Sequence, residues 1–200
     1  TITTTFPGGN ASVQRYEGNS VHLEPELRGD NPWFYWYFEA TGVQPGRVRF
    51  VFPQKVAGFI NGAIGYQGPA ISMDGGKTWK WMGTDTVNDN AFTYDFTKTG
   101  EVVRFAVTIP YVNTDLDTFL EQHARNPHLR KNVLTKSRGG REVELLRIGT
   151  PGPGKKALLL AARHHAAETI ASYVLEGMLE EAMSDTPDGK NFRRRYVLYA

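Results

Sequence analysis

Two histidines and a glutamate lie close together in the segment ARHHAAET, residues 162–169. The chain has no cysteine, so His, Asp and Glu are the only strong metal ligands that it offers. His165 and Glu168 are three residues apart, and their side chains can converge on one point if Glu168 lies in the first turn of a helix. An imidazole nitrogen and a carboxylate are two of the three protein ligands that a catalytic zinc needs. The spacing alone leaves another interpretation open, in which Glu168 favours a helix N-terminus and His165 is an ordinary loop residue.

The segment that carries these residues connects a predicted strand to a predicted helix. KALLLAA (156–162) is strand-like, and ETIASYVLEGMLEEAM (168–183) has the apolar spacing of an amphipathic helix. The start of a helix that follows a strand is the usual location of active sites in open α/β sheets. The apolar residues that define the helix are Ile170, Val174, Leu175, Met178, Leu179 and Met183.

The neighbouring elements predict the opening of an α/β domain. TDLDTFLEQHARNP (114–127) predicts a helix that begins at the N-cap Thr114 and ends at Pro127. Further along, the pattern predicts strands at REVELLRIG (141–149) and RRRYVLYA (193–200), with a turn or loop at DTPDGKN (185–191).

Residues 2–108 predict a different architecture, with short strands separated by turn residues. The expected strands are WFYWYFEA (33–40), RVRFVF (47–52), AFTYDF (91–96) and VVRFAVTI (102–109). The first is aromatic on both faces, as in a central strand that is buried on both sides, and the next two alternate. We therefore predict two domains: an all-β antiparallel sandwich at residues 1–110, and an α/β domain with a mixed sheet and flanking helices at residues 111–200.

Two further motifs have weaker functional interpretations. GTPGPGKK (149–156) fits a phosphate-binding loop as far as Lys155, but Lys156 replaces the Ser or Thr that reaches magnesium, so a turn between two antiparallel strands is favoured. SMDGGKTWKW (72–81) resembles the Asp box of sialidases and other propeller proteins. It occurs once, which predicts a single hairpin with its turn at residues 74–76. Exposed Trp79 and Trp81 side chains could still stack on sugar, so a carbohydrate-binding module is the alternative.

The composition limits the classes of partner. The formal net charge of +2 gives no reason to expect nucleic acid. The sequence has no apolar run long enough to span a bilayer and no recognisable signal peptide, so no membrane partner is expected. The lack of cysteine fits a cytoplasmic protein.

The segments SRGGREVELLRIGT (137–150) and KKALLLAARHHAAETIASYVLEGML (155–179) resemble the opening of the catalytic domain in the zinc metallocarboxypeptidase family. In that family a strand leads into an H-x-x-E motif, which a long helix follows. The β-rich first half, the segment YVNTDL (111–116) and the S-x-G-G-R motif are similar to the cytosolic-carboxypeptidase branch. Ala166 and Ala167 stand where this branch often has Pro-Gly.

This resemblance implies that His165 and Glu168 are ligands of Zn²⁺, with His164 as a second-shell neighbour. It also implies a second histidine ligand, a general-base glutamate and groups that grip the substrate's terminal carboxylate. In the family all of these lie downstream of the point that matches Ala200. The remaining histidines, His22, His123 and His128, precede the motif, and none of them is assigned as the third ligand. The remainder of the catalytic domain, in the same chain or in a separate one, is thus an expected partner, and the 200 residues alone are expected to be inactive.

The resemblance implies a zinc-dependent metallocarboxypeptidase that removes C-terminal residues from peptides or proteins. Basic residues near the domain junction, among them Arg138 and Arg141, form either a solvated surface loop or a patch that attracts acidic peptide tails. The competing class is a carbohydrate- or protein-binding β-module attached to an inactive catalytic remnant.

Overall fold

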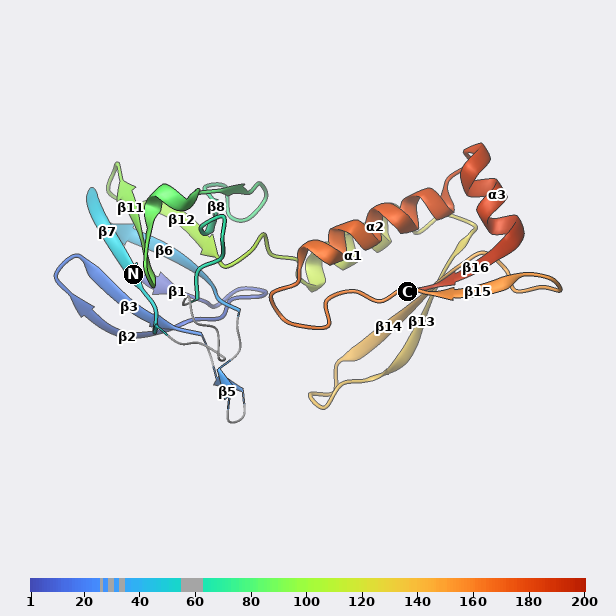
Figure 1. Ribbon diagram of the computed structural model, residues 1–200, viewed down its shortest axis with the longest axis horizontal. Coiled ribbons are helices and arrows are strands. Elements are labelled where there is room, and N and C mark those ends of the chain that lie inside the picture. The colour runs from blue at the N-terminus through green and yellow to red at the C-terminus, as the bar shows by residue number, and fades with distance from the viewer. Residues whose placement is uncertain (26, 29–30, 33–34, 55–62) are drawn as a thin grey trace. The chain divides into compact units, whose positions relative to one another are not determined.

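The computed structural model describes residues 1–25, 27–28, 31–32, 35–54 and 63–200 (Figure 1). These residues form two compact units. The N-terminal unit consists of Thr1–Val112 together with His165–Ile170, and the C-terminal unit consists of Asn113–His164 together with Ala171–Ala200.

The N-terminal unit contains two five-stranded sheets and a two-stranded ribbon. The first sheet has the order β1 (Ile2–Thr3), β6 (Tyr37–Val43), β12 (Glu101–Ala106), β8 (Ala70–Ser72) and β9 (Lys80–Trp81). The second has the order β10 (Val87–Asn88), β11 (Ala91–Phe96), β7 (Gly46–Val51), β3 (Ser20–Glu24) and β2 (Ser12–Glu17). A 3₁₀ turn lies at Thr84–Thr86, and β4 (Leu27–Arg28) pairs with β5 (Asn31–Pro32). Strands β3 and β7 are parallel, so the second sheet is mixed rather than purely antiparallel as expected.

Both sheets of the N-terminal unit contribute to one aromatic core. Phe38 on β6 and Phe105 on β12 pack against Phe50 on β7 and Phe92 on β11, and all four side chains are fully buried. Removing such a side chain from water contributes roughly 1.5–3 kcal/mol. The fully buried Trp36 stacks on this group and donates its indole N–H to the Ala63 carbonyl at 2.8 Å.

The expected strands of this unit are found, with shifted ends. Strand β6 lies between β1 and β12 and is buried on both faces at Tyr37 and Phe38, as the aromatic run predicts. It begins at Tyr37, and Trp33 and Phe34 of the predicted strand lie outside the described residues.

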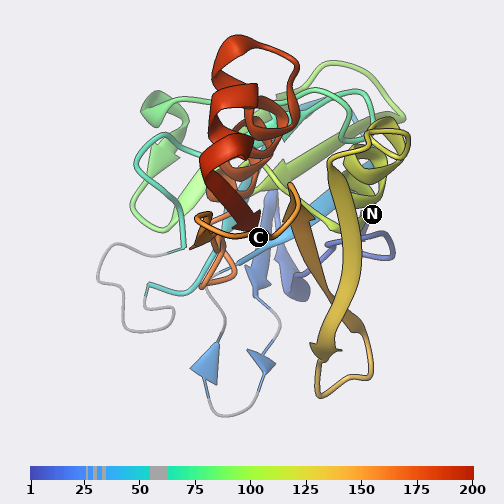
Figure 2. The same ribbon diagram turned by 90° about the vertical axis from the view of Figure 1, so that its right-hand side faces the viewer.

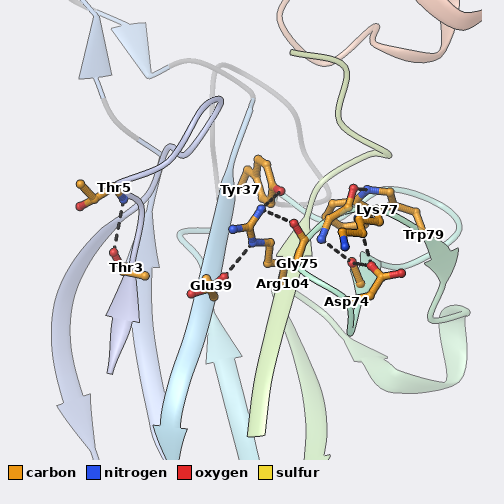
Figure 3. A network of polar contacts seen from close by, with 11 residues as sticks. Thr3, Thr5, Tyr37, Glu39, Asp74, Gly75, Lys77, Trp79 and Arg104 are labelled. Carbon is orange, nitrogen blue, oxygen red and sulfur yellow. Dashed lines mark hydrogen bonds and ion pairs between the residues drawn. The ribbon is translucent and has the colours of Figure 1, made fainter. Parts of the chain in front are cut away.

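The predicted hairpin at residues 72–81 is present, and the Asp74 carboxylate organises its turn (Figure 3). Asp74 Oδ2 accepts from the Thr78 hydroxyl at 2.6 Å. Its Oδ1 accepts from the Ser72 hydroxyl and from the backbone N–H groups of Lys77 and Thr78 at 2.8–3.0 Å. These hydrogen bonds, those from Thr78 first, hold the pKa of Asp74 well below its usual range.

Arg104 on β12 fastens this turn to the sheet, as Figure 3 shows. Its guanidinium donates to Glu39 Oε2 at 2.8 Å and to the Gly75 carbonyl at 2.6 Å. The turn approaches the sheet so closely that a Cβ on Gly76, where φ is 93°, would lie 2.9 Å from the Tyr37 hydroxyl. Glycine is therefore required at this position.

Substituting Asp74 is expected to destabilise the N-terminal unit in a pH-dependent way. In Asp74→Asn an NH₂ group replaces an acceptor oxygen, so the melting temperature at pH 7 should fall. Because the native pKa is lowered, the carboxylate's contribution is complete above the unfolded-state pKa of about 3.9 and is lost as the pH falls below it. Thermal melts should show the difference from wild type shrinking below about pH 4. Asp85→Asn is the matched control, and an equal deficit at pH 7 and pH 2.5 would contradict this account.

The C-terminal unit is a mixed four-stranded sheet with helices. Its elements are α1 (Asn113–Gln122), β13 (Leu129–Lys136), β14 (Glu142–Ile148), β15 (Lys156–Leu159), α2 (Ile170–Met183), α3 (Pro187–Arg195) and β16 (Tyr196–Tyr199). The strand order is β13-β14-β16-β15, with β15 parallel to β16 and the other pairs antiparallel. In Figure 1, α1 and α2 lie on the same side of this sheet, where Phe119 and Leu179 pack with Ile148 and Leu198.

Several expected boundaries in this unit are wrong. Helix α1 starts at Asn113, so Thr114 lies inside the helix, and it ends at Gln122, well before Pro127. Residues 129–136, not predicted as regular structure, form β13 and pair with β14. The expected loop at 185–191 is largely α3: Thr186 is its N-cap and accepts a hydrogen bond from the Gly189 N–H, with Pro187 in the first turn.

The apolar surface of α2 is buried only in part. Leu179, Ala182 and Met183 are buried, and Leu175 packs beside them. The other apolar residues of the pattern, Ile170, Val174 and Met178, are 43–54% exposed. The helix is apolar on more than one face, so periodicity did not identify the face that the sheet covers.

Strand β16 lies inside the sheet, between β14 and β15. The edge is β15, where Leu159 is 74% exposed. The sequence favours a turn between two antiparallel strands at residues 149–156. Strands β14 and β15 do run in opposite directions, but they are not neighbours, because β16 lies between them. Among the helices within the described residues, none combines the length and the apolar character that a membrane crossing requires.

Candidate metal centre

The H-x-x-E segment forms a turn between β15 and α2. The chain enters it through Arg163, which has a left-handed φ of 58°. The Glu168 N–H then donates to the His165 carbonyl at 3.2 Å. Helix α2 begins at Ile170, so Glu168 lies just before the helix and not in its first turn as expected. It is the turn that brings positions 165 and 168 together.

The His165 and Glu168 side chains converge. His165 Nδ1 lies 2.7 Å from Glu168 Oε1, and the His165 backbone N–H donates to Glu168 Oε2 at 3.1 Å. The two side chains are 78% and 48% exposed, so solvent reaches the point where they meet. The hydrogen bond to Oε2 fixes the carboxylate so that Oε1 faces the imidazole.

This donor pair fits a zinc ion. Two donors bound to one tetrahedral zinc at about 2.0–2.2 Å lie about 3.3–3.6 Å apart. The observed 2.7 Å separation is that of a hydrogen bond, so a small outward rotation of the imidazole would accommodate a metal in place of the shared proton. A nitrogen and a carboxylate oxygen are also ligand types that zinc prefers.

Within the described residues, no group of three or more His, Asp and Glu side chains could hold a metal. His22 lies by Glu17 with Nε2 at 3.3 Å from the carboxylate, and His123 lies 3.5 Å from Glu180. Neither belongs to the 165–168 turn. His164 is exposed, and in the part of the chain that the structure describes it makes no polar contact with His165 or Glu168.

The residue after each candidate ligand contacts the N-terminal unit. Ala166 packs against its aromatic core. The fully buried Thr169 donates its hydroxyl to the Ile109 carbonyl at 2.6 Å and lies 3.2 Å from the Thr108 hydroxyl. No local sequence pattern indicates this role, since Thr108 and Thr169 are 61 positions apart.

Arg138 and Arg141 lie at the tip of the β13–β14 hairpin and are exposed. Two hydrogen bonds close the tip. The Ser137 backbone N–H donates to the Arg141 carbonyl at 2.8 Å, and the Arg141 backbone N–H donates to the Ser137 hydroxyl at 3.1 Å. In Figure 2 this tip lies at the end of the C-terminal unit opposite α3. Arg138 and Arg141 therefore lie in or beside a solvated turn at the end of a hairpin.

The residues behind the weaker motifs have structural roles. Trp79 is half-buried, donates its indole N–H to the Gly76 carbonyl at 3.0 Å and packs edge-on against Tyr37. Lys155 donates to the nearby Thr150 carbonyl, and the element that follows it is a strand rather than the helix of a phosphate-binding loop.

Comparisons with known proteins show which proteins the chain resembles. Residues 116–200 match the zinc carboxypeptidase family. The chain is 29% identical over 181 residues to an uncharacterized protein of Zymomonas mobilis, covering 90% of this chain and 46% of that protein. It is 28% identical over 220 residues to human cytosolic carboxypeptidase 1, covering 88% of this chain and 18% of the human protein. It thus spans about half the length of the first relative and much less of the second.

Solved structures show the same carboxypeptidase-like fold, with mixed and antiparallel sheets. A metallo-carboxypeptidase from Pseudomonas aeruginosa, in complex with (2-guanidinoethylmercapto)succinic acid, superposes with a TM-score of 0.84 at 22% identity, covering 100% of this chain and 54% of that one. One from Burkholderia cenocepacia superposes with a TM-score of 0.80 at 24% identity, also covering 100% and 54%. The alternative of a binding module on an inactive remnant is not favoured by these relatives. The resemblance to zinc metallocarboxypeptidases of the cytosolic branch is confirmed by the match of residues 116–200 to the zinc carboxypeptidase family and by the similarity to cytosolic carboxypeptidases.

Proposed function

We propose that this chain is part of a zinc-dependent metallocarboxypeptidase that removes C-terminal residues from peptides or proteins. The observation that carries the proposal is the convergence of His165 Nδ1 and Glu168 Oε1 at 2.7 Å, inside the segment that matches the family. We also propose a cytosolic location, in keeping with the names of the cytosolic carboxypeptidases among its relatives.

The proposal includes a two-domain organisation. Residues 1–110 would form a β-sandwich domain, supported by the core that the two sheets share. Residues 111–200 would form part of an α/β carboxypeptidase domain, supported by the mixed sheet and by the family match at 116–200.

In this proposal His165 and Glu168 are two ligands of Zn²⁺, and His164 is a neighbour in the second shell. When bound, zinc would polarise the scissile carbonyl and lower the pKa of its water to about 7. The chain's own part is to present the imidazole and the carboxylate with fixed orientation, which the His165 N–H bond to Glu168 Oε2 provides. The third ligand and the general base would come from polypeptide beyond the described residues.

The remainder of the catalytic domain is the proposed partner of the C-terminal unit, and uncovered apolar surface supports this. Strand β15 is an exposed edge, with Leu159 turned to solvent. Beside it lies an apolar hollow of about 370 Å³, lined by residues of β15, α2 and α3 that include Leu158, Met178 and Phe192. Exposed apolar edges of this kind pair with further strands or aggregate.

Loss of either proposed ligand should abolish zinc binding. In the complete protein, His165→Ala and Glu168→Gln are each expected to weaken zinc affinity by more than about 100-fold, beyond the range of second-shell effects. The affinity is measured by competition with a chelator, and hydrolysis of the last peptide bond of a test peptide should fail in parallel. His22→Ala, whose ring lies beside Glu17, is the matched control.

His164→Ala tests whether His164 has a second-shell role. If it has one, its loss should weaken zinc affinity about tenfold, and if it has none, zinc affinity should not change. Zinc retained with unchanged affinity in both ligand variants would refute the proposed metal centre.

Amide hydrogen exchange should show whether a further segment of the catalytic domain pairs with the edge of β15. In the 200-residue chain, the β15 amides that do not bond to β16 should exchange rapidly, because that edge is open. In the complete protein they should become protected, while the β16 amides stay protected in both. Rapid exchange of these β15 amides in the complete protein would contradict the proposal that a further segment pairs with this edge.

The proposed basic patch should affect the choice of substrate. In the complete enzyme, Arg138→Glu with Arg141→Glu should lower kcat/KM for peptides with acidic C-termini by about tenfold and leave neutral peptides nearly unchanged. The control is Arg194→Glu with Arg195→Glu, which makes the same charge change on α3. An unchanged preference for acidic C-termini after reversal at the hairpin tip would eliminate this role.

A further inference from the structure

The six residues His165–Ile170, which include both proposed ligands, belong by their contacts to the N-terminal unit. Their sequence neighbours on either side, up to His164 and from Ala171, belong to the C-terminal unit. The H-x-x-E turn is therefore part of the N-terminal unit, although the residues before and after it belong to the C-terminal unit.

Thr169 makes the stronger of the two attachments. Its side chain has no exposed surface, and its hydroxyl donates to the Ile109 carbonyl at 2.6 Å. A hydroxyl has a single proton, so the Thr108 hydroxyl, 3.2 Å away and itself buried, donates to Thr169 Oγ1. All three groups are satisfied by one another, and a side chain without a hydroxyl at 169 would leave the Ile109 carbonyl without this donor.

Ala166 makes the second attachment. Its methyl group packs against the aromatic core of the N-terminal unit. Ala166 directly follows His165, and Thr169 directly follows Glu168, so an anchored residue adjoins each proposed ligand. Because Ala166 and Thr169 are fixed, the backbone that carries His165 and Glu168 has little freedom to move the imidazole away from the carboxylate.

We propose that Thr169 is a positioning residue for the metal centre, and that the N-terminal unit forms the support on which the H-x-x-E turn is held. This inference rests on the proposed function, because it assumes that His165 and Glu168 bind zinc. Thr169 acts through Glu168: its bond to Ile109 fixes the backbone from which the carboxylate extends. Groups that hydrogen-bond directly to metal ligands usually contribute 10- to 100-fold to metal affinity, and Thr169, which acts one step further away, is expected at the lower end of this range.

The test measures zinc affinity in the complete protein for Thr169→Val and Thr169→Ser. Valine has nearly the same shape as threonine but no hydroxyl, and zinc affinity is expected to fall about tenfold. Serine keeps the hydroxyl and should restore affinity to within about twofold of wild type. The visible spectrum of the Co²⁺-substituted protein should change in the valine variant and not in the serine variant, because it reports the geometry of the ligands.

The control is Thr86→Val, in the same unit. Thr86 also donates to a backbone carbonyl, that of Gly83 at 3.0 Å, but it lies outside the H-x-x-E turn. This variant should keep zinc affinity and the Co²⁺ spectrum. If Thr169→Val does not fold, Thr108→Val provides the second measurement: it removes only the neighbouring hydroxyl and should weaken zinc binding about threefold.

Unchanged affinity and an unchanged Co²⁺ spectrum in a folded Thr169→Val protein, or in Thr108→Val if that variant is needed, would overturn the inference. Equal loss in the valine and serine variants would also overturn it, because the hydroxyl would then not be the active group. Both results leave the proposed function standing as long as His165→Ala still abolishes zinc binding. Zinc binding that does not depend on His165 would overturn the proposed function and this inference together.

Discussion

The aromatic core shared by the two sheets of the N-terminal unit is the interaction on which the other described features of that unit depend. Phe105 fixes β12 within this core, between β6 and β8. The chain continues from β12 to Thr108 and Ile109, the two residues to which Thr169 is hydrogen-bonded. Ala166 packs against the same core. Burial of aromatic rings far from any chemistry thus sets the position of the turn that carries the proposed ligands.

Carboxylates in this unit occupy two kinds of environment. Glu101 is buried; burial alone would raise its pKa, but hydrogen bonds from Thr97 and the Tyr94 hydroxyl outweigh that effect and lower it. Burial and this contact with Glu101 raise the pKa of Tyr94 to about 12. Such a carboxylate stabilises a turn and is inaccessible to a ligand. Glu168 is about half exposed and shares Oε1 with an imidazole, which is the environment of a group that can exchange a hydrogen bond for a metal ion.

The sequence predicted those features that depend on local patterns. Alternation in residues 47–52 and 91–96 identified β7 and β11, and the spacing of His165 and Glu168 identified their convergence. It missed β13, because LRKNVLTK is almost wholly exposed and lacks an apolar alternation. It missed α3, because Asp, Gly and Pro in this segment resemble a turn, although Thr186-Pro187 is a helix-start signal. The place of β16 and the contact of Thr169 with Thr108 depend on residues distant in sequence, which no local pattern encodes.

The position of β16 between β14 and β15 has a consequence for how the chain folds during synthesis. Strand β15 is made before its parallel partner, and the 36 residues 160–195 separate the two. At about 5–20 residues per second, β15 waits roughly 2–7 seconds on the ribosome before β16 follows it. During this interval the apolar strand has no hydrogen-bonding partner from β16, and the sheet of the C-terminal unit cannot form as a whole. A nascent chain should therefore depend on chaperones most strongly between the synthesis of β15 and that of β16.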